Sequence, residues 1–158
     1  MLDYLKFLFK STNHHGVHSP FVFALLTKCL YRKPKLSKDK LNDLVLKSVG
    51  YFNCKTILAE DDVLKAQLIR QLPNVKFQAK NYDLVVIKRL KRNFLEASLD
   101  SGGIHNDTMI IVQDLNKNRE VWNTVIKNPK VTVSLDGFST GILFIRKEQV
   151  KQHFTIRL

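Results

Sequence analysis

Four cations follow directly on an apolar run in the middle of the chain. Lys88, Arg89, Lys91 and Arg92 come within five residues of the run DLVVI at residues 83–87. Ammonium and guanidinium groups gathered at one connection can hold the phosphates of a nucleic acid, a contact that gives affinity without reading the sequence. Aromatic residues that could stack on bases do not alternate with these cations, and a solvated basic loop is the competing interpretation.

Three histidines near the start of the chain are the other residues whose type could do chemistry. Neutral imidazole is a common metal ligand, and His14, His15 and His18 are close in sequence. No cysteine or acidic residue lies at ligand spacing beside them, so a structural role is favoured. The two cysteines of the chain are far apart and match no metal or redox spacing. The sequence therefore predicts no metal site.

The elements that position these residues begin with helices. Apolar residues recur at helical spacing in residues 2–9 and again in residues 41–52, and Ser19-Pro20 is a typical helix start. A basic linker, RKPKLSKDK at residues 32–40, lies between the second and third predicted helices and is interpreted as a solvated segment. We expect residues 1–52 to form a helical extension that packs on the remainder, residues 53–158.

Strands and helices then alternate. The predicted strands are KTILA, VKFQA, DLVVIK and TMIIV, which begin at Lys55, Val75, Asp83 and Thr108. Such alternation implies a mainly parallel sheet with helices on both faces. The runs VTVSLDG and GILFIRK near the end are joined by a short glycine-containing connection, which predicts an antiparallel pair.

The helices between these strands have recognisable starts. Asp61 and Asp62 can cap a helix that Pro73 stops, and Asn93 with Glu96 has the spacing of a capping box. A further helix is expected around the only tryptophan of the chain.

Two stretches carry a family resemblance. HHGVHSPFVF, residues 14–23, and the C-terminal stretch of residues 112–158 resemble a group of small bacterial class I S-adenosylmethionine-dependent methyltransferases. The resemblance implies an α/β, Rossmann-like methyltransferase fold. Its sheet would be mainly parallel, with an antiparallel C-terminal hairpin and preceding N-terminal helices.

The chain departs from the family where the cofactor would bind. In the family the first strand ends in an acidic residue and a glycine-rich turn, because a Cβ there would collide with the cofactor. Here Glu60 and Asp61 follow the first strand without a glycine, and Lys88 replaces the family aspartate after the third. A strand–helix unit between these strands is predicted to be missing. If the cofactor site is retained, its candidate residues are Glu60, Asp61 and Asp114.

Two main functions are compatible with these observations. One is a methyltransferase-like protein that has lost S-adenosylmethionine binding, needs no cofactor, and binds nucleic acid, another polyanion or a protein partner. The alternative is an active S-adenosylmethionine-dependent methyltransferase on an unidentified acceptor. The 26 lysines and arginines against 14 acidic residues give a net charge of +12, which favours a polyanion partner. A third hypothesis assigns the N-terminal helices to homo-oligomerisation or to a protein partner.

Composition and length set the protein class. The length of 158 residues fits one folded domain. The composition, with 44% hydrophobic and 25% charged residues, excludes a disordered protein. No stretch approaches the roughly 20 apolar residues of a transmembrane helix, and no secretory signal is recognisable. We therefore expect no transmembrane segment and a cytoplasmic location.

Overall fold

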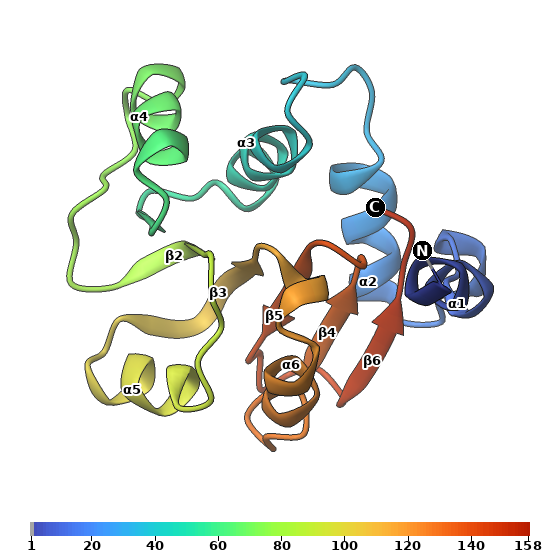
Figure 1. Ribbon diagram of the computed structural model, residues 1–158. Coiled ribbons are helices and arrows are strands. Elements are labelled where there is room, and N and C mark those ends of the chain that lie inside the picture. Colours follow the sequence, from blue (N-terminus) through green and yellow to red (C-terminus); the bar gives the residue numbers. More distant parts are fainter. Residues whose placement is uncertain (1) are drawn as a thin grey trace.

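Six strands form one mixed sheet in the computed structural model, which describes residues 2–158 (Figure 1). In chain order the strands are β1 (Ile57–Ala59), β2 (Tyr82–Ile87), β3 (Ile104–Val112), β4 (Val133–Asp136), β5 (Gly141–Phe144) and β6 (Gln152–Thr155). Across the sheet their order is β1-β2-β3-β5-β4-β6. The pairs β1–β2, β2–β3 and β4–β6 are parallel, and β5 is antiparallel to both β3 and β4.

The sheet confirms the predicted α/β class and the mostly parallel arrangement. The expected C-terminal pair is also confirmed, because β4 and β5 are antiparallel and Leu135 lies opposite Ile142. The strand order does not match a standard Rossmann-like sheet, in which the first strand lies in the middle. Here β1 lies at one edge of the six-stranded sheet.

Two strand assignments differ from the sequence prediction. VKFQA was expected to be a strand, but this was wrong: it contributes a single bridge, in which Lys76 pairs with Thr56. Two backbone hydrogen bonds flank this bridge, from the N–H of Ile57 to Lys76 and from the N–H of Lys76 to Lys55. Conversely, β6 was not predicted, since its sequence QHFT is short and largely polar.

Six α-helices accompany the sheet in the described residues. They are α1 (Leu2–Lys10), α2 (Pro20–Leu25), α3 (Lys40–Phe52), α4 (Asp62–Gln71), α5 (Phe94–Asp100) and α6 (Arg119–Val125). Shorter helical turns are η1 (His14–Gly16), η2 (Leu26–Leu30) and η3 (Leu115–Lys117).

The predicted helix starts can be compared with the observed caps. Ser19 and Asp61 cap α2 and α4 as expected. In each case the side-chain oxygen accepts the backbone N–H of the residue three positions later in the chain. The capping box of Asn93 and Glu96 was wrong. Asn93 makes no capping bond, and the carboxylate of Glu96 instead accepts from the amide of Asn128 at 2.7 Å.

Helices cover both faces of the sheet. Alternate residues of β2 divide between two apolar clusters, with Val86 in one and Val85 in the other. The first cluster joins the sheet to α2, α3 and α4, and the second joins it to α5 and α6. Figure 1 shows the two groups of helices on opposite sides of the strands. None of the helices in the described part of the chain is long and apolar enough to span a membrane.

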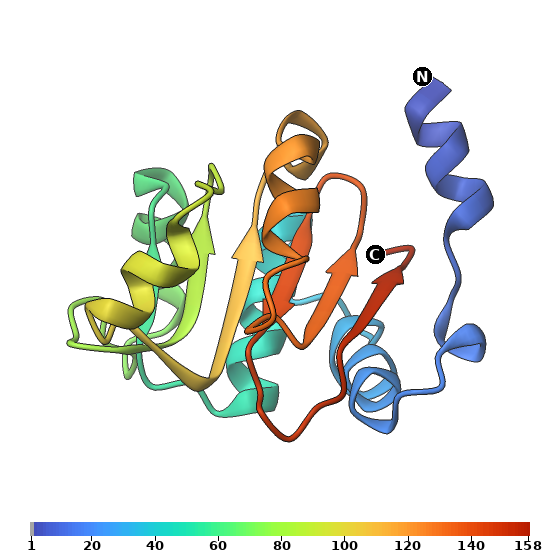
Figure 2. The same cartoon turned by 90° about the horizontal axis from the view of Figure 1, so that it is seen from below.

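The segment after α1 lies against the last strand. The N–H of Thr12 donates to the carbonyl of Thr155 at 2.9 Å, and Thr12 forms a parallel bridge with Ile156. The hydroxyl of Tyr31 donates to the carbonyl of Arg157 at 2.7 Å. Seen from below in Figure 2, the C-terminal end of the chain lies on the same side of the sheet as the N-terminal segments. The N-terminal region is thus joined to the sheet by backbone hydrogen bonds as well as by the core.

Candidate functional site

One edge of the sheet collects the carboxyl ends of several strands. β1, β2 and β3 are parallel, and β4 has the same direction because two antiparallel steps through β5 separate it from β3. Ligands of open α/β sheets bind at this edge. Glu60, Lys88 and Asp114 directly follow β1, β2 and β3 respectively, so these three candidate residues lie at this edge.

Glu60 joins the end of β1 to the end of β2. Its N–H donates to the carbonyl of Val86 at 3.0 Å, and its carboxylate Oε2 accepts the N–H of Lys88 at 3.0 Å. The residue is exposed, but these two bonds direct its carboxylate to the backbone of the neighbouring strand.

Asp61 caps α4 and binds the same lysine. Its Oδ1 accepts the N–H of Leu64 at 2.9 Å, and its Oδ2 lies 3.2 Å from the ammonium of Lys88. These two interactions hold the pKa of Asp61 below its ordinary value, the hydrogen bond from Leu64 being the larger cause. The N-terminus of α4 could otherwise receive an anion, and Asp61 already supplies one.

Asp114 lies apart from the other two carboxylates. β2 separates the strand that precedes it from β1, and Asp114 adopts a left-handed backbone conformation with φ of +48°. Its carboxylate lies 3.3 Å from the ammonium of Lys117. The structure therefore brings Glu60 and Asp61 together around Lys88 and leaves Asp114 on another strand.

The side chain of Gln113 is a polar group at this edge that sequence reasoning did not select. Its Nε2 is buried and has no hydrogen-bond partner among the described residues. The backbone N–H of Gln113 donates to the carbonyl of Ile87 at 2.8 Å, which holds the backbone of Gln113 beside the end of β2.

The predicted basic cluster is partly neutralised. Lys88 forms an ion pair with Asp61, and Arg92 forms one with Glu120. Arg89 and Lys91 are exposed and form no ion pair within residues 2–158. Only two of the four cations are thus uncompensated.

A cavity of about 510 Å³ lies farther along the same edge, between α1 and the ends of β4 and β6. Its lining consists of charged, polar and aromatic residues: Asp3, Lys6, Phe7, Lys10, Asn116, Arg119, Asp136, Phe138 and Thr155. None of the carboxylates predicted from the sequence is among them.

Arg119 organises one wall of this cavity. Its guanidinium forms an ion pair with Asp136, donates to the carbonyl of Phe138 at 2.9 Å, and lies 5.4 Å from the centre of that residue's ring. Phe138 has φ of +70°, an uncommon conformation for a residue with a side chain. The N–H of Phe138 donates to Asp136 at 2.9 Å, which helps to hold this turn. These three residues were missed because nothing in the sequence between β4 and β5 indicates which side chains meet.

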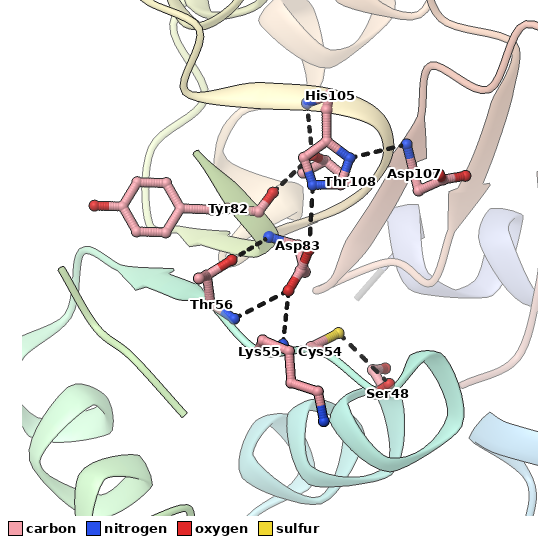
Figure 3. A network of polar contacts seen from close by, with 9 residues as sticks. All are labelled: Ser48, Cys54, Lys55, Thr56, Tyr82, Asp83, His105, Asp107 and Thr108. Carbon is pink, nitrogen blue, oxygen red and sulfur yellow. Dashed lines mark hydrogen bonds and ion pairs between the residues drawn. The ribbon is translucent and has the colours of Figure 1, made fainter. Parts of the chain in front are cut away.

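A polar network occupies the opposite edge, at the amino ends of the first three strands (Figure 3). One oxygen of Asp83 accepts the N–H groups of Lys55 and Thr56 at 2.6 and 3.0 Å, and the other lies 3.2 Å from Nε2 of His105. Burial raises the pKa of Asp83, but these hydrogen bonds outweigh it, and the pKa lies below its ordinary value. The network joins the amino ends of β1, β2 and β3.

Cys54 lies beside this network with a buried, free thiol. Burial raises the pKa of its thiol to about 12, with the nearby carboxylate of Asp83 as a further cause. A thiol that stays protonated at neutral pH is a poor nucleophile. Within the described residues, no group of three or more histidine, cysteine, aspartate or glutamate side chains could hold a metal ion.

The predicted histidine segment forms the turn η1 and its flanks. The ring centroids of His14 and His15 lie 4.0 Å apart. Val17, which precedes His18 in the sequence, is buried.

In comparisons with known proteins, no family model, curated protein or solved structure matches this chain.

Proposed function

We propose that this chain is a methyltransferase-like protein that does not use S-adenosylmethionine and acts by binding a polyanion, with nucleic acid as the preferred ligand. The observation that carries the proposal is the linkage of Glu60 and Asp61 to Lys88 between the ends of β1 and β2. The resemblance implies that the adenosyl cofactor would sit at this position, next to a glycine-rich turn.

The course of the chain supports a shortened Rossmann-like sheet. After β1 the chain passes through α4 and returns at Lys76, which bridges to Thr56 just before β1. It then continues into β2, which lies on the inner side of β1. α4 and α5 pack on opposite faces, as helices do on either side of the point where strand order reverses. In this interpretation the residues around Lys76 are what remains of the strand–helix unit expected from the family.

The chemistry of the turn after β1 argues against the family cofactor. Each residue from Ala59 to Asp62 carries a side chain, whereas close approach to a cofactor requires glycine. The carboxylate of Asp61 holds the N-terminus of α4 and would repel the carboxylate of the methionine moiety. Lys88, which could attract that carboxylate, is already paired with Asp61.

The charge of the protein supports a polyanionic ligand. Its excess of 12 positive charges raises the local concentration of polyanions and the rate at which they associate. Most of the lysine and arginine side chains are exposed, so they are available for contacts with phosphates.

Calorimetric titration separates the two functions. S-adenosylmethionine and S-adenosylhomocysteine should give no binding heat, whereas a mixed-sequence oligonucleotide should bind with an affinity that falls steeply with salt. Micromolar binding of either adenosyl compound would overturn the first half of the proposal. An affinity for the oligonucleotide that does not depend on salt would overturn the second half.

A further inference from the structure

The segment from Lys28 to Lys40 carries an uncompensated positive charge. Its six cations are all exposed and form no ion pair within the described residues: Lys28, Arg32, Lys33, Lys35, Lys38 and Lys40. We call this set the basic collar. Its one acidic residue, Asp39, is used in capping α3, where it accepts the N–H of Asn42 at 2.7 Å.

A buried ion pair gives the basic collar a defined shape. Lys47 and Asp43, with side chains 6% and 11% exposed, are 2.8 Å apart on α3. Asp43 also accepts the N–H of Leu36 at 2.6 Å, and the ammonium of Lys47 lies 3.4 Å from the carbonyl of Leu30. The pair therefore holds the segment from Lys28 to Lys40 to α3 at two points, Leu30 and Leu36. Because Lys47 compensates Asp43, this carboxylate does not neutralise the collar.

Two neighbouring cavities open within the basic collar. The larger, of about 510 Å³, combines the apolar side chains of Leu30 and Leu44 with Lys33, Lys35 and Lys40. The smaller, of about 260 Å³, is lined among others by Lys28, Leu36 and Tyr51. Arg32 and Lys47 line both cavities, so the two are adjacent.

An exposed aromatic ring accompanies the cations of the smaller cavity. Tyr51 is 38% exposed and Leu36 is 54% exposed, although both are large apolar residues. The ring of Phe52 packs edge-on against Tyr51 at 4.8 Å between centroids and restricts its position. Drug-sized ligands occupy cavities of about 300–1,000 Å³, so the smaller cavity suits a single ring rather than a whole cofactor.

We propose that the basic collar and Tyr51 form a binding site for single-stranded nucleic acid. Phosphates contact the collar cations, and one base enters the smaller cavity between Tyr51 and Leu36. Cationic grooves with stacking aromatic residues bind single strands in this way, and a duplex keeps its bases out of such a cavity. The inference rests on the proposed function and places the polyanion-binding surface at the basic collar. The cluster Lys88–Arg92 is less suited, because two of its cations are already paired.

The test compares charge-matched variants by fluorescence anisotropy. The probe is a fluorescein-labelled, mixed-sequence DNA strand of about 15 nucleotides, free or paired with its complement. The collar variant is Arg32→Gln, Lys33→Gln, Lys35→Gln and Lys40→Gln. The control variant is Lys80→Gln, Lys127→Gln, Lys130→Gln and Lys147→Gln, which removes the same charge from exposed lysines without ion pairs in the described residues.

We expect the wild type to prefer the single strand. The collar variant should lower the logarithmic salt slope by about 0.7 for each lost phosphate contact, and the control variant should lower it far less. Tyr51→Ala should weaken binding by about five- to a hundredfold with an unchanged salt slope, and Tyr51→Phe should restore it.

The outcomes distinguish the site from the function. Equal loss in the collar and control variants, a larger loss on neutralising Lys88–Arg92, or a wild-type preference for duplex would overturn the collar site. Each of these outcomes would leave polyanion binding standing. If the wild type binds neither probe near physiological salt, both the site and the proposed function are wrong.

Discussion

Asp83 connects the amino ends of the first three strands through its carboxylate. Its carboxylate accepts two backbone N–H groups just before β1 and contacts His105 at the start of β3. In Asp83→Asn, an amide NH₂ group replaces one acceptor and leaves a donor facing other donors. We expect a loss of about 1–3 kcal/mol in the free energy of unfolding at neutral pH. Urea denaturation followed by tryptophan fluorescence measures it.

The loss should depend on pH in a defined direction. The pKa of Asp83 is lower in the folded protein than in the unfolded chain, so its contribution to stability is complete above about pH 4. That contribution disappears as the pH falls through the folded-state pKa. The gap between wild type and Asp83→Asn should therefore narrow in acid. Asp100→Asn, at an exposed carboxylate, should show little loss at any pH, and a constant gap for Asp83→Asn would contradict the assignment.

Individual site residues were the hardest feature to predict from the sequence. Asp61 was found as a helix cap because its partner lies three residues away. Asp83 and His105 were not found, since their partners come from different strands and only the strand register brings them together. The same reason explains Arg119, whose carboxylate partner Asp136 is 17 residues away.

At the scale of elements, the packing of α6 on β5 depends on a glycine. A Cβ on Gly141 would lie 2.6 Å from the ring of Trp122, which is 2% exposed. We expect Gly141→Ala to reduce the free energy of unfolding by about 1–3 kcal/mol, as overpacking does in cores. Thermal unfolding by circular dichroism measures the effect.

Gly50 provides the matched control for this substitution. It lies in α3, and a Cβ built on it meets no atom within 4 Å. Gly50→Ala should therefore raise stability by about 0.5–1 kcal/mol, because alanine favours a helix. A similar loss in both variants would show that the contact with Trp122 is not the cause.

Elements were predicted well where the signal was local. The start of α2 at Ser19-Pro20 and the buried strands β2 and β3 follow from neighbouring residues. The prediction was wrong for VKFQA and missed β6, and both errors have one physical reason. A short strand exists only if a partner lies beside it. VKFQA pairs at one position next to the short β1, whereas QHFT pairs along all of β4.

At the scale of the whole molecule, the same strands supply residues to the apolar clusters on both faces of the sheet. η2 and α3 bury Leu26 and Val45 on one face, and α6 buries Trp122 on the other. The strands between them carry residues of both clusters. Backbone bonds between Thr12 and the C-terminal strand add a second link between the N-terminal region and the sheet.

This arrangement predicts that residues 1–52 and the sheet unfold together. Leu26 is fully buried in the first cluster, so Leu26→Ala should cost about 2–5 kcal/mol. Trp122, the only tryptophan, reports on the opposite face. Its fluorescence midpoint in urea should fall together with the circular dichroism midpoint, because a cooperative domain has one transition. Leu5→Ala, at a residue 46% exposed, should leave both midpoints nearly unchanged. A Leu26→Ala protein whose ellipticity falls before its fluorescence changes would show that the N-terminal region unfolds as a separate unit.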